Sequence, residues 1–326
     1  MKTAVITGAT GQDGYYLIKF LLEKGYKVIA VSRRTSTPNT GRLYNSPLWN
    51  KGNWILVNGD VTDSANMASI CREHKPDEWY HLAAQSHVGI SWQSPITTAE
   101  ITGVGTLNCL EAIRKEKSDC RFYFAGSSEQ FGNSSINGLA LDENSPMTPE
   151  SPYAAAKVFG YNITQVYRKS YNMFASCGIL FNHESPLRGE EFVTRHITKN
   201  LAQIALKKQN TCLSLGNIKS FRDWGFAGDY VEGMWLMLQH SQPDDFVLAT
   251  GETHSVQEFI NISLEYFGLD WSCIYIDPLK FRPNDVNFLL GNYSKAKSLL
   301  GWQPKCSFKE LVHKMCKADY TGNYYE

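Results

Sequence analysis

Four side chains that can take part in proton transfer lie close together in the sequence: Ser127, Glu129, Tyr153 and Lys157. Tyr153 and Lys157 are four positions apart, so in a helix they lie on the same face. There the lysine ammonium favours the ionised phenol, and we expect the pKa of Tyr153 to be lowered. A tyrosine with a lowered pKa can act as a base near neutral pH. Ser127 and Glu129 add a hydroxyl and a carboxylate, so the group holds one acid-base residue more than the oxidation of an alcohol requires.

Alternating strands and helices must position these residues. Short apolar runs bounded by glycine and polar residues predict strands, and longer amphipathic runs predict helices. The chain opens with a strand, a glycine turn, a helix and a second strand, which predicts an α/β fold with a doubly wound parallel sheet of the Rossmann type. Strands are expected at Thr3–Thr7, Lys27–Val31, Trp54–Val57, Glu78–His81, Arg121–Ala125 and Ala175–Leu180. Helices are expected up to Lys24 and at Ser64–His74, Pro95–Lys115 and Tyr153–Tyr171.

The sequence changes character after Phe181, where turn residues, arginines and aromatic residues become frequent. We interpret this part as a smaller second lobe of mixed α/β structure, with helices near residues 193–207, 230–239, 256–267 and 308–318. The predicted division is a dinucleotide-binding domain of residues 1–182, with part of roughly 222–252 interleaved, and a substrate-binding domain of residues 183–326. Ligands of open α/β sheets bind at the carboxyl ends of the strands, so the site is expected in a cleft there.

The first turn carries glycines with the spacing G-x-x-G-x-x-G. A tight strand-to-helix turn uses similar glycines, so the spacing alone is a weak signal. Its place between a strand and a helix at the chain start favours a pyrophosphate site at the helix N-terminus. The expected cofactor contacts in this turn are Gly8, Thr10, Gly11, Gln12, Asp13 and Gly14.

The second strand ends in Val31-Ser32-Arg33-Arg34, without the acidic residue that binds the ribose of NAD. An arginine suits the 2′-phosphate of NADP, so we predict NADP bound by Arg33; two solvated arginines on a loop are the alternative interpretation. Asp60 follows the third strand and can hold the adenine. The other expected cofactor contacts are Val61, Leu82, Ala83, Ala84, Gln85 and Ser86.

Composition excludes several classes of partner. Of 326 residues, 43% are hydrophobic and 20% charged, and 32 basic residues balance 32 acidic ones. The zero net charge gives no field that favours nucleic acid or membrane. There is no apolar run of the ~20 residues that a membrane span needs. We also expect no signal peptide, because the first strand begins at Thr3. The eight cysteines form no C-x-x-C pair, so we expect free thiols, no metal and a cytoplasmic protein.

The chain resembles the extended short-chain dehydrogenases/reductases and, within them, the GDP-mannose 4,6-dehydratases, nearly end to end. Asn182-His183-Glu184-Ser185-Pro186 and Arg222-Asp223-Trp224-Gly225 are specific to this group, whereas the Tyr-x-x-x-Lys pair is shared by the whole superfamily. Further matching segments are Gly8–Gly14, Arg33–Ser36, Asn39–Arg42, Leu82–Val88, Ser127–Gly132, Phe192–Arg195, Ala249–Glu252 and Phe281–Pro283. There are three departures: Ser127 replaces a common threonine, Leu187 replaces an arginine found in some members, and the segment 269–281 is shorter.

The resemblance implies a redox-neutral dehydration that yields a 4-keto-6-deoxy sugar nucleotide. Tyr153 would take the proton of the C4 hydroxyl while hydride leaves C4 for NADP, and Lys157 would lower the pKa of Tyr153 and bind the nicotinamide ribose. Ser127 would position the C4 oxygen. Glu129 would remove the C5 proton and assist the loss of the C6 hydroxyl as water, after which NADPH returns hydride to C6.

The resemblance also implies further contacts. His183 and Arg188 match cofactor contacts of the family, although a lone histidine at a strand end is often structural. Arg222 and Arg282 are candidates for the diphosphate of a GDP-sugar, because guanidinium forks suit phosphate. The other implied substrate contacts are Ser86, Ser127, Asn182, Glu184, Val193 and Lys199.

A homodimer or homotetramer is implied as well. The helices Pro95–Lys115 and Tyr153–Tyr171 would form a four-helix dimer interface. The loop Arg33–Arg42 would reach a neighbouring subunit in a tetramer.

Three other functions stay open on the sequence. The same dehydration could act on a GDP-manno-heptose, whose C4–C5–C6 unit is identical. A sugar-nucleotide 4-epimerase or 4-reductase has no need of a base at C5, so Glu129 argues against it. A non-catalytic NADP-binding sensor has no need of Ser127, Tyr153 and Lys157.

Overall fold

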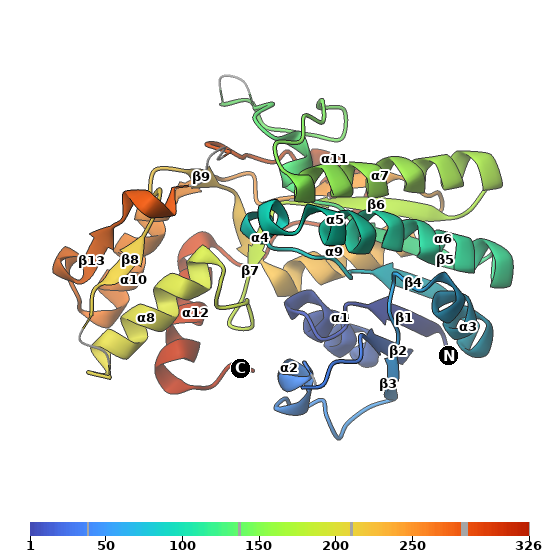
Figure 1. The fold of residues 1–326 in the computed structure, drawn as a ribbon, viewed down its shortest axis with the longest axis horizontal. Coiled ribbons are helices and arrows are strands. Elements are labelled where there is room, and N and C mark those ends of the chain that lie inside the picture. Colours follow the sequence, from blue (N-terminus) through green and yellow to red (C-terminus); the bar gives the residue numbers. More distant parts are fainter. Residues whose placement is uncertain (38, 136–137, 209–210, 282–285, 326) are drawn as a thin grey trace.

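The computed structural model describes residues 1–37, 39–135, 138–208, 211–281 and 286–325. Most of the first 180 residues form a parallel sheet with helices on both faces, and a smaller lobe lies beside the ends of its strands (Figure 1). Arg282, expected at the diphosphate, lies outside the described residues. In the described part of the chain, no helix is both long enough and apolar enough to cross a membrane.

The central sheet has seven strands in the order β11-β6-β5-β4-β1-β2-β3, and every neighbouring pair is parallel. The strand order steps outward from β1 in both directions, which is the doubly wound topology. The predicted fold class is therefore confirmed. The strands are β1 (Thr3–Thr7), β2 (Lys27–Ser32), β3 (Trp54–Asn58), β4 (Glu78–His81), β5 (Arg121–Ala125), β6 (Ala175–Leu180) and β11 (Asp245–Leu248).

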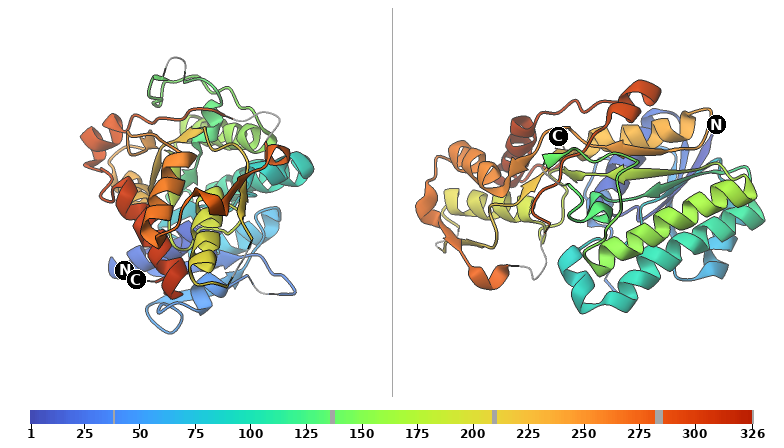
Figure 2. Two further views of the ribbon diagram at one scale, coloured as in Figure 1. Left: turned by 90° about the vertical axis from the view of Figure 1, so that its left-hand side faces the viewer. Right: turned by 90° about the horizontal axis from the view of Figure 1, so that it is seen from above.

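Helices cover both faces of this sheet, as the right-hand view of Figure 2 shows. Apolar side chains alternate along β1: Val5 belongs to the core under α3, α6 and α7, and Ala4 and Ile6 belong to the core under α1 and α9. Two buried cores thus hold the sheet rigid. The helices are α1 (Gln12–Glu23), α2 (Gly41–Tyr44), α3 (Ser64–His74), α4 (Val88–Gln93), α6 (Gly105–Glu116), α7 (Pro152–Tyr171) and α9 (Ala227–Gln239).

The helix α7 carries Tyr153 and Lys157, and its ends are defined by the sequence. The Ser151 hydroxyl accepts a hydrogen bond from the backbone N–H of Ala154, and Pro152 occupies the first helical position. Asn172 ends the helix in the left-handed conformation. The N-cap fixes the first turn, so Tyr153 has a defined position at the carboxyl ends of the strands.

The long helix predicted over Pro95–Lys115 differs in detail. It consists of α5 (Pro95–Thr98), a π-helical turn η1 (Ala99–Val104) and α6. The turn is followed by a close contact, because a Cβ at Gly105, the first residue of α6, would lie 2.8 Å from the Val61 side chain. Such π-turns are frequent at functional sites, and η1 contributes Ile101 to the cofactor cavity described below.

The second lobe has its own core, built around α8, α10 and α12. Ser255 and Ser307 form capping boxes that start α10 and α12. Its helices are α8 (Val193–Ala205), α10 (Val256–Phe267), α12 (Phe308–Thr321) and the short η4 (Trp271–Cys273) and η5 (Pro278–Lys280). Its paired strands are β8 (Leu213–Leu215) with β13 (Ile274–Ile276), β7 (Asn182–Glu184) with β10 (Trp224–Phe226) and β9 (Phe221–Arg222) with β12 (His254–Ser255).

The chain crosses between the lobes more than once. β11 and α9 lie on the central sheet although they follow β7 and β10 in the sequence. The helix α11 (Ser294–Leu300) and Trp302 also pack into the core beside α9. The division at residues 182 and 183 stays a prediction.

Candidate active site

A cavity of about 490 Å³ lies along the carboxyl ends of the central strands. We call it the cofactor cavity. It brings together the following predicted residues: Gly8, Thr10, Gly11, Gln12, Asp13, Gly14, Arg33, Asp60, Val61, Leu82, Ala83, Ala84, Gln85, Ser86, Ser127, Glu129, Tyr153, Lys157, His183 and Arg188.

The glycine turn forms one wall of this cavity. Gly8 has a φ of +72°, and a Cβ at this position would lie 2.7 Å from the backbone nitrogen of Ala83. A side chain at Gly8 would thus be strained and would clash with the loop after β4. Gly11 precedes the first residue of α1 and offers no side chain to cap it. The first N–H groups of α1 are therefore suited to a pyrophosphate, as the sequence predicts.

Tyr153 and Lys157 lie side by side in the wall of the cofactor cavity, 8% and 4% exposed. The ammonium of Lys157 lies 5.8 Å from the centre of the Tyr153 ring and donates a hydrogen bond of 2.6 Å to the carbonyl of Ala125. Burial lowers the pKa of Lys157 to about 8. Burial thus disfavours the charged form of Lys157, which lies beside the Tyr153 phenol.

The pKa of Tyr153 differs from the sequence expectation. Its pKa is raised to about 12: burial raises it most, a hydrogen bond with Ser127 lowers it, and the charge of Glu129 raises it. The sequence shows the spacing of the tyrosine and the lysine but not the loss of solvent around the phenol, and this loss has the larger effect. Burial of the phenol therefore opposes its ionisation.

Ser127 and Glu129 are held by a short 3-10 helix, η2 (Ser128–Phe131), directly after β5. The Ser127 hydroxyl accepts a hydrogen bond of 3.3 Å from the backbone N–H of Glu129, and the Gln130 side chain accepts one of 2.7 Å from the backbone N–H of Ser127. This capping box fixes the turn, so the hydroxyl and the carboxylate both reach the cavity that Tyr153 lines.

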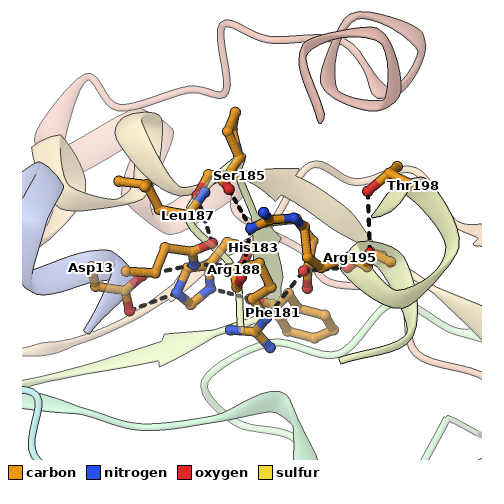
Figure 3. A network of polar contacts seen from close by, with 12 residues as sticks. Asp13, Phe181, His183, Ser185, Leu187, Arg188, Arg195 and Thr198 are labelled. Carbon is orange, nitrogen blue, oxygen red and sulfur yellow. Dashed lines mark hydrogen bonds and ion pairs between the residues drawn. The ribbon is translucent and has the colours of Figure 1, made fainter. Parts of the chain in front are cut away.

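A second polar pair, Asp13 and His183, also lines the cofactor cavity (Figure 3). The Nε2 atom of His183 lies 2.8 Å from an oxygen of Asp13, and its Nδ1 lies 2.8 Å from the carbonyl of Phe181. Burial alone would lower the pKa of His183, but the charge and hydrogen bond of Asp13 raise it overall. Burial alone would raise the pKa of Asp13, but His183 lowers it overall. The pair favours an imidazolium beside a carboxylate.

A second cavity of about 460 Å³ continues from the first toward the smaller lobe. We call it the substrate cavity. The residues that line both cavities are Ser86, Ser127, Glu129, Tyr153, Asn182 and Arg188. Glu184, Val193 and Arg222 line the substrate cavity as predicted, whereas Lys199 lines neither cavity and pairs with Glu190. The acid-base residues thus stand where the two cavities meet.

Arg222 owes its place to its neighbour Asp223, which is fully buried. The Asp223 carboxylate accepts hydrogen bonds from the backbone N–H and hydroxyl of Thr250, both 2.7 Å, from Gly251 N–H at 3.0 Å and from Gly291 N–H at 3.2 Å. Burial raises the pKa of Asp223 to about 6 against these hydrogen bonds. The Arg-Asp-Trp-Gly segment is thereby tied to two other segments, and Arg222 is held at the cavity.

The substrate cavity also contains residues that sequence reasoning missed. His87 and Phe192 lie within the matched segments Leu82–Val88 and Phe192–Arg195, so their position was a usable signal. His196 and Lys280 were not predictable locally, because Lys280 comes near α8 only through the pairing of β8 with β13. Burial and the charge of Lys280 lower the pKa of His196. The other missed residues include Ser214, Gly216 and Asn217.

A model of the GDP-mannose 4,6 dehydratase family matches residues 5–315. The chain belongs to this family. GDP-mannose 4,6 dehydratase 1 of Arabidopsis thaliana is 49% identical over 327 residues, which cover 98% of this chain and 90% of the relative. Members of the GDP-mannose 4,6-dehydratase family are enzymes of the dehydratase class. In this chain Ser127, Glu129, Tyr153 and Lys157 all line the cofactor cavity.

Solved structures with lower identity share the fold. A dTDP-glucose 4,6-dehydratase from Bacillus anthracis in complex with NAD superimposes with a TM-score of 0.87 at 19% identity, covering 99% of this chain and 97% of that one. RMD from Pseudomonas aeruginosa complexed with NADPH gives a TM-score of 0.81 at 20% identity, covering 98% and 100%. The fold, a doubly wound parallel sheet with a smaller second lobe, is thus common to this chain and to both neighbours.

Proposed function

We propose that the chain converts GDP-mannose to GDP-4-keto-6-deoxymannose with a tightly held NADP. One observation carries the proposal: Ser127, Glu129 and Tyr153 line both cavities at their junction, where a sugar would meet a nicotinamide. An alcohol oxidation needs the tyrosine, the lysine and the hydroxyl. The carboxylate at the same place supplies the acid-base group that an elimination needs.

The chain's residues have separate roles in this reaction. Tyr153 accepts the proton of the C4 hydroxyl, whose oxygen is oriented by Ser127. A nicotinamide dinucleotide held in the cofactor cavity beside Tyr153 and Lys157 would supply the hydride acceptor for C4 and the hydride donor for C6. Glu129 takes the C5 proton, which the 4-ketone has made acidic, and protonates the departing C6 hydroxyl, which leaves as water. The proton that Tyr153 took from the C4 hydroxyl is released as one proton is taken up at C5, so the net change is the loss of one water.

The cofactor cavity fits a nicotinamide dinucleotide, and the related folds bind NAD or NADPH in their solved structures. The choice of NADP rests on Arg33, which follows β2 and lines the cavity without an acidic residue at the strand end. Titration of the cofactor-stripped protein with NADPH and NADH, followed by nicotinamide fluorescence, tests this choice. We expect tighter binding of NADPH, and Arg33→Ala should weaken NADPH but not NADH; tighter binding of NADH would contradict the proposal.

The proposal that the substrate is a nucleotide sugar rests on the substrate cavity. Arg222 is 8% exposed and reaches this cavity, where a guanidinium fork suits a diphosphate. Incubation of the purified protein with GDP-mannose and no added cofactor, followed by mass spectrometry, tests the substrate. We expect loss of one water without net reduction of NADP. Dehydration of a GDP-manno-heptose without turnover of GDP-mannose would overturn the choice of sugar but not the chemistry.

We further propose a homodimer. Exposed apolar side chains follow the outer faces of adjacent helices: Ile96 is 73% exposed, Val104 45%, Phe159 44% and Val166 48%. Such a row is typical of an isologous helical interface. A tetramer contact through Arg33–Arg42 stays a prediction, and Arg42 is engaged within its own chain, donating to the carbonyls of Leu187 at 2.8 Å and Thr10 at 3.3 Å. The cytoplasmic location also stays a prediction.

A further inference from the structure

Arg188 stands in the wall that the cofactor and substrate cavities share. Its Nε atom lies 3.1 Å from a carboxylate oxygen of Glu184, and its guanidinium lies 3.7 Å from the centre of the Phe192 ring. Glu184 is itself buried and accepts a hydrogen bond of 2.6 Å from the Thr194 hydroxyl. A cation in this place can bind polar groups of ligands in both cavities, provided that the turn that carries it is fixed.

That turn, residues 185–188, is held by another arginine, Arg195 of α8 (Figure 3). The Nη1 atom of Arg195 donates to the carbonyls of Pro186 and Arg188, the latter at 3.0 Å. Its Nε lies 2.9 Å from both oxygens of Asp319. One planar guanidinium thus joins the backbone of the turn to a carboxylate on α12.

Asp319 brings the C-terminal helix into this network. Its side chain is 1% exposed and accepts a further hydrogen bond of 2.7 Å from the Thr198 hydroxyl. The guanidinium of Arg195 also lies 4.8 Å from the centre of the Tyr324 ring. None of Arg195, Thr198 and Asp319 lines either cavity, so they act on ligands through the turn they hold.

A buried ion pair contributes little to stability on balance, because desolvation of both charges offsets their attraction. An apolar pair would fill the same space but could not bind two backbone carbonyls. The guanidinium fork can do so because its donors are fixed in one plane. Positional accuracy matters here, since a displacement of about 1 Å in a positioning group can cost roughly a hundredfold in rate.

We propose that the Arg195–Asp319 pair is a positioning device that fixes Arg188 between the cofactor and substrate cavities. The helix α12 thereby contributes to the binding of both ligands although it touches neither. This inference rests on the proposed function for the identity of the ligands.

Asp319→Asn is the first test, since it removes the charge while keeping the shape. The chain offers a matched control in Arg168 and Asp245, which also form a buried arginine–aspartate pair. Arg168 likewise donates to a backbone carbonyl, that of Ala175, at 2.6 Å, and neither Arg168 nor Asp245 lines the cofactor cavity or the substrate cavity. Asp245→Asn should therefore lower the melting temperature without changing ligand affinity.

The readouts are the dissociation constants of NADPH and GDP, measured by titration, together with KM and kcat for GDP-mannose. For Asp319→Asn we expect both dissociation constants and KM to rise about tenfold, with kcat changed less, because Arg188 binds rather than reacts. Asp245→Asn should leave all of them within about twofold of the wild type. Unchanged NADPH and GDP affinities in folded Asp319→Asn would overturn the inference, as would an equal loss in the control.

Two further arrangements keep the test decisive. If Asp319→Asn does not fold, Thr198→Val removes one hydrogen bond to the same carboxylate, and we expect about a threefold weaker NADPH affinity; an unchanged affinity would overturn the proposal. The binding titrations need no turnover. If the wild type does not turn over GDP-mannose, the proposed reaction is refuted. Weaker binding of NADPH and GDP by Asp319→Asn than by the wild type would still support the positioning role.

Discussion

The positive charge of Lys157 should lower the free energy of unfolding at neutral pH, compared with a neutral side chain at the same position. Burial lowers the pKa of this lysine from 10.5 to about 8. Through proton linkage, the difference corresponds to about 3 kcal/mol at neutral pH. The sign follows from the direction of the shift: the cost is full below the folded pKa and disappears as pH rises to the unfolded pKa.

Lys157→Met removes this titration while keeping a side chain of similar length. We expect the free energy of unfolding of the variant, relative to the wild type, to fall by about 2 kcal/mol between about pH 7 and about pH 9.5. The packing change contributes equally at both pH values and cancels. The assay is urea unfolding of the cofactor-stripped proteins at a series of pH values, with Lys19→Met, on the exposed side of α1, as the control.

A stability difference that does not depend on pH would refute this reasoning, because it would mean that the Lys157 ammonium is solvated in the folded chain. A difference that grows with pH would show that the sign is wrong. The variant should lose dehydratase activity in either case, since its methionine cannot bind the nicotinamide ribose or carry a charge beside Tyr153.

Three further predictions follow from the site and its surface. Glu129→Gln should lower the rate of water loss by about a hundredfold or more, while slow oxidation at C4 persists and is seen as NADPH absorbance in a single turnover. Dehydration at the normal rate would show that Glu129 is not the base at C5. His183→Gln should destabilise the protein most between about pH 4 and about pH 6.5, where both partners of the pair are charged. The difference in unfolding free energy should shrink above the raised pKa of His183 and below the lowered pKa of Asp13. A difference that is the same inside and outside this pH range would contradict the charged pair. Phe159→Asp together with Val166→Asp should convert a dimer to a monomer in light scattering, whereas a matched change at the exposed Tyr275 of β13 should not; an unchanged mass would place the interface elsewhere.

The sequence predicted the sheet well because its strands are short apolar runs between clear stop signals. Gly25 ends α1 with a positive φ, and the strand from Lys27 follows at once. Buried parallel strands are apolar on both faces, so they can be recognised without knowledge of their neighbours. The short helix α4 was not predicted, because its six residues are too few to show a helical period.

The candidate site was predictable where one local segment supplies both the residue and its position. Ser127 and Glu129 follow a strand and Tyr153 begins a helix, and the structure brings all three together. The pKa of Tyr153 was not predictable, since burial of the phenol depends on segments far away in the sequence. Lys199 shows the same limit: it is close in sequence to Val193, but its side chain turns to Glu190 instead.

The role of Arg195 is the clearest case of what sequence alone leaves out. Arg195 lies within a matched segment, yet two of its partners are the nearby backbone carbonyls of Pro186 and Arg188. Its third partner is the carboxylate of Asp319, more than a hundred residues away in the sequence. Backbone acceptors have no side-chain signature, so a motif cannot reveal them. Interactions of this kind become visible only when the turn, α8 and α12 are placed together.

The central claim is that one site oxidises C4, eliminates water and reduces C6 with the same hydride. Turnover of GDP-mannose deuterated at C4, without added cofactor, tests this most directly when the product is examined by mass spectrometry and NMR. The account predicts one water lost, with the deuterium retained and located at C6. Deuterium lost to solvent, or held on a reduced cofactor that accumulates, would contradict it.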